Sequence, residues 1–219
     1  MLVRSSGPLL VGLSALLLSA YVIAKELPVL AYGDQQSIDT TVALVRGDLQ
    51  QAFSFYGQKR LMAACMQGMT GTWSALAPPE QRLAHAKNCL DRALSFAEDT
   101  PVEALTWTVA SRASLVIGDI EAMNRYLDYA WRAGPNEQWI AGLRVNLAQE
   151  AVGSLSASNQ RNLDLDLAVM VMSRKGISAI ANRYWSDEIF RERITRIVEE
   201  MPAEDQRRFV RSVRRATVN

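Results

Sequence analysis

Lysine, histidine and cysteine are scarce in this chain of 219 residues, and each scarcity narrows the chemistry open to it. The formal net charge is only +1, so no strong overall field favours nucleic acid or a strongly charged substrate. The one histidine is His85, which sharply limits histidine-based catalysis and metal binding. Arginine greatly outnumbers lysine, and we interpret this excess as the codon bias of a GC-rich bacterial genome.

Motifs that mark an active site are also missing. The sequence has no nucleophile elbow, phosphate-binding loop, zinc-protease motif or dinucleotide-binding glycine cluster. A catalytic triad would have to use His85, and no serine signature accompanies that residue. Acidic pairs such as Glu98–Asp99 occur at predicted helix ends, where carboxylates are commonly solvated. We therefore expect no enzyme activity, no catalytic residue, no cofactor and no metal site.

The long hydrophobic run of this chain lies at its N-terminus. Residues 9–24 carry no charge, and Lys25 and Glu26 end the run. A membrane-spanning helix needs ~20 residues, so the run is somewhat short for a span but longer than a minimal signal-peptide core. We interpret residues 1–25 as an uncleaved signal anchor of a bacterial inner membrane, with Arg4 in the cytoplasm and the main domain in the periplasm.

Two alternatives exist for this N-terminal segment. A signal peptide cut after residues 22–24 would leave a periplasmic chain, whereas a buried core helix is disfavoured because the run has no polar face. Beyond the run, Pro28 and Gly33 discourage a continuing helix, so residues 26–36 are predicted to be an extended linker. Nucleic acid is not an expected partner in the periplasm, and no wide basic patch favours it.

The rest of the chain has hydrophobic residues at helical spacing, interrupted by glycine and proline, which predicts an all-α protein. Its clearest unit is residues 106–135. Two short helical patterns meet there at Gly118–Asp119, and the second ends at Gly134–Pro135. This arrangement is a helical hairpin, the unit from which stacked helical proteins are built.

Seven residues of this hairpin fall at a recognisable spacing, from a large residue that opens the first helix to a proline that ends the second. They are Trp107, Ala110, Ser111, Gly118, Leu127, Ala130 and Pro135. With these residues the segment resembles a tetratricopeptide repeat, although Ser114 replaces the usual aromatic residue and Met123 the usual alanine. The resemblance implies a short antiparallel stack of helical hairpins, a tetratricopeptide-like solenoid, over residues 37–176, with a C-terminal helical extension over residues 177–219.

Cys65 and Cys89 lie on two successive predicted helices, at similar distances from the connection at residues 77–79. In an antiparallel hairpin outside the cytoplasm they can come opposite each other, which favours a disulfide. Two buried free thiols are the alternative, because the separation of the Cα atoms cannot be read from sequence. His85 adds at best one further metal ligand, so we interpret it as a packing or surface residue.

The last predicted helix, residues 203–216, is acidic at its start and basic afterwards. Its candidate contact residues for a partner or an anion are Arg207, Arg208, Arg211, Arg214 and Arg215. The order of charge complements the helix dipole, and this is the simpler interpretation. The alternative is contact with anionic lipid headgroups, an anionic polymer or an acidic partner.

These observations favour a membrane-anchored scaffold of helical hairpins that binds another envelope protein. Stacked helix pairs form surfaces suited to peptides and partner helices, and the resemblance to tetratricopeptide repeats implies an interaction module. An assembly for polysaccharide synthesis or export is one plausible client, from compartment and shape alone. The alternatives are a structural subunit of an inner-membrane complex and a helical carbohydrate-active enzyme.

Overall fold

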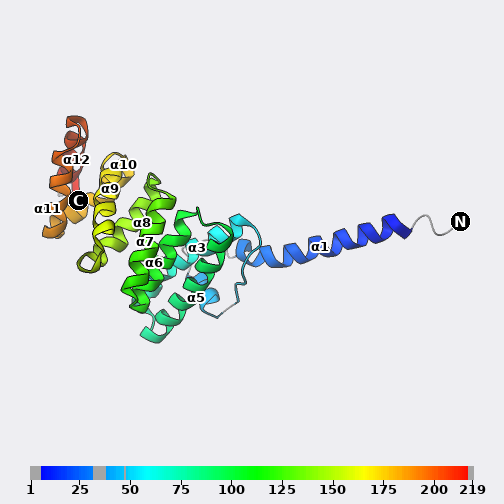
Figure 1. Ribbon diagram of the computed structural model, residues 1–219. Coiled ribbons are helices and arrows are strands. Elements are labelled where there is room, and N and C mark those ends of the chain that lie inside the picture. The colour runs from blue at the N-terminus through cyan, green and yellow to red at the C-terminus, as the bar shows by residue number, and fades with distance from the viewer. Residues whose placement is uncertain (1–5, 32–37, 47, 217–219) are drawn as a thin grey trace. The chain divides into compact units, whose positions relative to one another are not determined.

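The computed structural model describes residues 6–31, 38–46 and 48–216, and every regular element within these ranges is a helix (Figure 1). The all-α class expected from the sequence is therefore confirmed. The chain divides into two compact units, residues 1–92 and residues 93–219, here called unit 1 and unit 2. The division falls inside helix α5 (Pro79–Asp99), within the range that the sequence suggests is one repeat domain.

Unit 1 starts with the long helix α1 (Ser6–Ala31), drawn in blue in Figure 1. Its segment Gly7–Leu30 is long and apolar enough to cross a membrane. The prediction of an extended linker is wrong for residues 26–31, which form the last turns of α1, and residues 32–36 lie outside the described part of the chain. The helix continues past Pro28 because the Ser54 amide donates a hydrogen bond to Glu26 and because Val29 is buried. These contacts outweigh the backbone N–H that proline lacks.

The body of unit 1 is built around α3, against which α1, α2 and α4 pack. Ser54 begins α3 as its N-cap, because its hydroxyl accepts a hydrogen bond from the Gly57 amide at 2.9 Å. Three methionines of α3, Met62, Met66 and Met69, are buried in the core of unit 1. Besides α1 and the first part of α5, the helices of unit 1 are α2 (Ile38–Arg46), α3 (Phe55–Thr70) and α4 (Thr72–Leu76).

Unit 2 opens with the hairpin predicted at residues 106–135, which the structure forms from α6 (Ala104–Ile117) and α7 (Ile120–Ala133). Gly118 ends α6 with a φ of 90°, a left-handed conformation that residues with a Cβ rarely adopt. Asp119 then starts α7, because its side chain accepts a hydrogen bond from the Ala122 amide. The sequence signals at Gly118–Asp119 therefore correspond to a C-cap followed at once by an N-cap.

The remaining helices of unit 2 pack in chain order. From α6 onward, each helix contacts the next one along the chain and the next but one, up to α12. Residues 163–167, in which Leu and Asp alternate, are helical, and the burial follows the helix: Leu163 and Leu167 are buried while Leu165 is exposed. These elements are α8 (Gln138–Glu150), the 3-10 turn η1 (Val152–Ser154), α9 (Ala157–Val171), α10 (Arg174–Ser186), α11 (Glu188–Glu199) and α12 (Ala203–Ala216).

Candidate functional site

A polar pocket with a volume of about 820 Å³ lies in unit 2, where the end of α9 meets α10 and α12. Helices α10 and α12 contact each other directly and form most of its wall. The pocket combines four guanidinium groups and one carboxylate with two hydroxyl groups and two apolar side chains. Its lining residues are Met172, Arg174, Ile177, Ser178, Glu204, Arg208, Arg211, Ser212 and Arg215. We call this feature the arginine pocket.

The amphipathic character of α12 places its arginines at this pocket. Phe209 and Val213 are buried and belong to the hydrophobic core of unit 2. Residues on the other side of the same helix must therefore face solvent. Arg208 also ties α12 to the end of α9, because its Nη1 donates a hydrogen bond to the Met172 carbonyl oxygen at 2.9 Å. Ile177, which is buried on α10, anchors the facing wall.

The arginines of the pocket differ in how far their charge is already compensated. Arg208 forms ion pairs with Glu204 at 3.4 Å and with Asp205 at 3.1 Å. Within the described part of the chain, Arg174, Arg211 and Arg215 form no ion pair with an acidic side chain. Three guanidinium groups at one pocket are thus available for an anionic ligand, and each can donate paired hydrogen bonds to a carboxylate or phosphate.

The structure sorts the five arginines that the sequence singled out. Arg208, Arg211 and Arg215 line the pocket, whereas Arg207 and Arg214 do not. Glu204 and Asp205 lie in the first turn of α12 and Arg214 and Arg215 in the last, an order of charge that complements the helix dipole. Sequence reasoning missed Arg174, whose only signal is the Arg174–Lys175 pair; folding of α10 against α12 brings it to the pocket.

A second surface lies on the α6–α7 hairpin. The Trp107 ring lies 5.9 Å from the Tyr126 ring and 5.1 Å from the Tyr129 ring, between ring centroids. Its indole Nε1 donates a hydrogen bond to the Pro101 carbonyl oxygen at 2.7 Å, which holds the ring in place. Trp107, Tyr129 and the exposed Val102 line a shallow depression of about 360 Å³. Rigid aromatic side chains of this kind are common at protein-binding surfaces.

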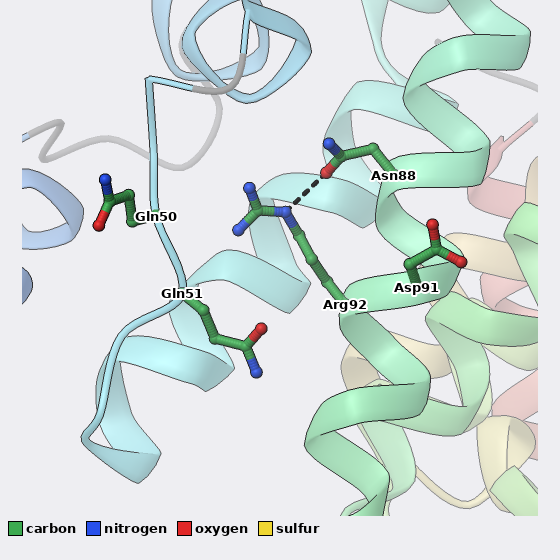
Figure 2. Close-up of a pocket in the computed structure, with 5 residues that line it drawn as sticks. All are labelled: Gln50, Gln51, Asn88, Asp91 and Arg92. Atoms are coloured by element: carbon green, nitrogen blue, oxygen red, sulfur yellow. Dashed lines mark hydrogen bonds between the residues drawn. The ribbon is translucent and has the colours of Figure 1, made fainter.

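Unit 1 carries a polar depression of about 370 Å³, shown in Figure 2. The Arg92 side chain extends from α5 toward the segment that carries Gln50 and Gln51 (Figure 2). Its Nε donates to the Asn88 Oδ1 atom and its Nη2 to the Leu49 carbonyl oxygen, each at 2.6 Å. Burial lowers the pKa of Arg92. Because its guanidinium is already bonded within unit 1, Arg92 acts there as a structural link.

Cys65 and Cys89 form a disulfide between α3 and α5, with their Cα atoms 5.7 Å apart. His85 lies beside it, with its Nε2 atom 3.6 Å from the Cys89 sulfur and the Trp73 ring 5.3 Å away. Burial lowers the pKa of His85 to about 4, against a weaker opposing effect of a hydrogen bond with the Cys65 backbone. His85 is thus a neutral packing residue near neutral pH.

Unit 2 contains a buried ion pair that sequence reasoning missed. The Arg144 Nε and Nη2 atoms donate to the two carboxylate oxygens of Asp166, at 2.8 and 2.6 Å. Arg144 Nη1 also donates to the carbonyl oxygens of Ala130 and Gly134, at the end of α7. Burial raises the pKa of Asp166, and the Arg144 guanidinium opposes that rise. The pair joins α7, α8 and α9 at one point, which indicates a structural role.

Neither metal-binding groups nor comparisons with known proteins indicate a function. Among the residues that the structure describes, no group of three or more His, Cys, Asp or Glu side chains is placed to hold a metal ion. Comparisons of the chain with known protein families, curated proteins and solved structures find no match. The arginine pocket is therefore the candidate functional site on the evidence of its geometry alone.

Proposed function

We propose that this chain is a membrane-anchored, extracytoplasmic helical scaffold that binds an acidic segment of another bacterial envelope protein at its arginine pocket. The observation that carries the proposal is the set of three guanidinium groups, Arg174, Arg211 and Arg215, that have no acidic partner in the described part of the chain. An assembly for polysaccharide synthesis or export is one client that fits this compartment and shape.

Anchoring is supported by helix α1. Every described side chain from residue 7 to residue 24 is exposed to solvent, although most are large and apolar. An apolar surface of this size is unfavourable in water and needs an apolar environment to cover it. A lipid bilayer covers a helix of about this length. The segment 22–24, where a signal peptidase would cut, lies inside the continuous helix. Cleavage favours unfolded backbone, so this favours the uncleaved anchor over the secreted alternative.

The disulfide supports the extracytoplasmic side. Disulfides persist in oxidising compartments such as the periplasm and are rare in the cytosol, where thiols are kept reduced. Cys65 and Cys89 are both fully buried in unit 1, between helices that follow the anchor in the chain. An anchor with Arg4 on the cytoplasmic side places these residues in the periplasm.

The scaffold role is supported by the way the helices of unit 2 pack. Contacts between each helix and its next two neighbours along the chain are typical of stacked helical hairpins. This is the feature that a tetratricopeptide-like stack would share, and it agrees with the resemblance carried by residues 106–135. Such stacks present extended surfaces that bind peptides and partner helices.

Crosslinking at the arginine pocket tests the binding function. A photoreactive amino acid replaces Ser212, which lines the pocket, in the full chain in its native membrane. We expect it to capture an envelope protein through an acidic segment that mass spectrometry identifies. The same amino acid at Val210, which is exposed on α12 but does not line the pocket, provides the matched control and is expected to capture nothing specific.

A charge reversal sharpens this test. Arg211→Glu is expected to abolish the crosslink, because like charges now face each other, whereas Arg207→Glu makes the same change on the same helix outside the pocket. Equal loss with both variants would mean that the pocket does not bind the partner. Capture of no envelope protein would overturn the scaffold function. Measuring the mass of the mature N-terminus separates the uncleaved anchor from the cleaved signal.

A further inference from the structure

Unit 1 carries three exposed aromatic side chains beside the point where α1 joins it. Phe53, Phe55 and Tyr56 expose 59%, 51% and 61% of their surface. All three lie at the start of α3 or directly before it. We call these three residues the aromatic rim. Exposed aromatic side chains gathered in one place usually mark a surface that is covered in the working protein.

Hydrogen bonds to Glu26 join this rim to the end of α1. The Glu26 carboxylate accepts hydrogen bonds from the Phe53 amide at 2.6 Å and the Ser54 amide at 2.7 Å. It also accepts one from the Ser54 hydroxyl at 2.7 Å. Lys25 adds a hydrogen bond to Gln50. Hydrogen bonds that a carboxylate accepts from backbone amides are strong, so the rim keeps a defined position beside the helix.

This attachment sets the level of the rim along α1. The Phe53 ring lies 5.7 Å from the Tyr21 ring, between centroids. Tyr21 precedes Lys25 by four residues, which at ~1.5 Å per residue is about one helical turn toward the apolar run. Phe53 therefore lies level with the last turn of the segment 7–24, on the N-terminal side of Lys25, which is the first charged residue of the helix.

We infer that the aromatic rim is embedded in the headgroup region of the bilayer that α1 crosses, so that unit 1 rests on the membrane surface. The inference rests on the proposed membrane anchoring by α1. If residues 7–24 span the bilayer, a ring beside Tyr21 must lie at the membrane–water interface. Aromatic side chains are enriched at this depth because one part of the ring is apolar and its edge is polar.

Two basic side chains near the aromatic rim also fit contact with a lipid surface. The Lys59 ammonium lies 5.8 Å from the Phe55 ring centroid, and the Arg60 guanidinium lies 5.8 Å from that of Tyr56. Arg60 also donates a hydrogen bond to the Tyr56 hydroxyl at 3.3 Å. Basic side chains this close to the rings can contact anionic phospholipid headgroups while the rings lie deeper. A lipid surface therefore matches both the apolar and the charged part of this surface.

Photocrosslinking to lipid tests the inference with the full chain. The protein is placed in bilayer nanodiscs of phosphatidylcholine and phosphatidylglycerol that carry a diazirine in the upper part of the acyl chain. After illumination, lipid adducts are mapped by mass spectrometry of proteolytic peptides. We expect adducts in two places: residues 7–24, and the peptide that contains Phe53, Phe55 and Tyr56. Leu76, which is 77% exposed in unit 1 and follows the opposite end of α3, serves as the apolar control and is expected to carry none.

The outcomes separate this inference from the anchoring on which it rests. Adducts on residues 7–24 without adducts on the aromatic rim would overturn the inference and leave the anchor intact. Absence of adducts on residues 7–24 would overturn the anchor, and the inference with it. Protection of the rim by a second copy of the chain or by another protein would also overturn the inference. The triple variant Phe53→Ser, Phe55→Ser, Tyr56→Ser is expected to lose the rim adducts and keep those of α1.

Discussion

The two units of this protein join their helices by different kinds of interaction. Unit 1 joins α3 to α5 by a covalent bond, the Cys65–Cys89 disulfide, next to the buried neutral His85. Unit 2 joins α7, α8 and α9 by the buried ion pair of Arg144 and Asp166. The ion pair satisfies two carbonyl groups at a helix end and depends on both partners, whereas the disulfide mainly restricts the unfolded chain.

The two units also differ in the apolar surface that they bury. In unit 1, the described residues 7–24 of α1 are exposed and add nothing to its core. Unit 2 has a continuous hydrophobic cluster that runs from Met123 in α7 to Val213 in α12. A small core gains most from a covalent link, because little burial is available to offset the loss of chain entropy. A larger core can accommodate a desolvated ion pair.

The largest expected effect comes from breaking the ion pair of unit 2. Asp166→Ala leaves the Arg144 guanidinium buried without its carboxylate, and we expect it to destabilise unit 2 by about 3–5 kcal/mol. Amide hydrogen exchange of the full chain, resolved by peptide, measures this loss in unit 2 and is expected to show unit 1 unchanged.

Two controls define this effect. The double variant Arg144→Met, Asp166→Leu removes both charges and is expected to recover much of the lost stability, because no buried charge is left unpaired. Glu188→Ala breaks the pair of Arg191 with Glu188, whose side chain is 78% exposed, and is expected to cost less than about 1 kcal/mol. A comparable loss for the exposed pair would contradict the role assigned to burial.

Removing the disulfide is expected to weaken unit 1 alone. The two cysteines are 24 positions apart, so the double variant Cys65→Ser, Cys89→Ser loses about 3 kcal/mol through the added entropy of the unfolded chain. Peptide-resolved hydrogen exchange is expected to show faster exchange in α3 and the first part of α5. Unchanged protection there would mean that the disulfide does not stabilise unit 1. In the wild-type chain, reduction by dithiothreitol is expected to have the same effect.

Acid is expected to destabilise unit 1 through His85. Its pKa is about 4 in the folded state and 6.5 when unperturbed, so the folded state binds fewer protons between these values. Stability is therefore complete above pH 6.5 and is lost as the pH falls toward 4, by up to about 3 kcal/mol. His85→Gln removes this titration, so its unfolding free energy is expected to vary less with pH over this window. Equal pH profiles for the two proteins would contradict this prediction.

The smallest expected effect concerns one methyl group at two helical glycines. A Cβ atom at Gly68 would lie 2.3 Å from the His85 Nε2 atom, so Gly68→Ala is expected to cost about 1–3 kcal/mol. At Gly142 in α8 the nearest atom would be Met170 Cε at 3.6 Å, an ordinary contact. Gly142→Ala is therefore expected to be neutral or to stabilise unit 2 by up to about 1 kcal/mol. Thermal unfolding of the two variants measures the contrast, and equal shifts would refute it.

Sequence reasoning predicted the helices better than their ends and contacts. The hairpin at residues 106–135 was predictable because Gly118, Asp119 and Gly134 are local signals that act within one or two turns. The end of α1 was not predictable, because Pro28 argues locally against a helix. The hydrogen bonds that outweigh it come from Phe53 and Ser54, more than 25 positions away.

The candidate site shows the same division. The sequence indicated basic residues in the later part of the last helix, and three of them, Arg208, Arg211 and Arg215, line the arginine pocket. It did not indicate Arg174, because no local pattern states that α10 lies beside α12. Nor did it distinguish Arg211, which has no acidic partner in the described chain, from Arg208, which is paired with Glu204 and Asp205.

By itself, the sequence determined the all-α class, the apolar N-terminal segment and the central hairpin, because hydrophobic period and capping residues act locally. Only the tertiary structure decided which side chains meet. It paired Arg144 with Asp166, placed Glu26 at the start of α3, and gathered the arginine pocket from three helices. Each of these contacts joins residues at least 20 positions apart, and no spacing rule along the chain encodes such a distance.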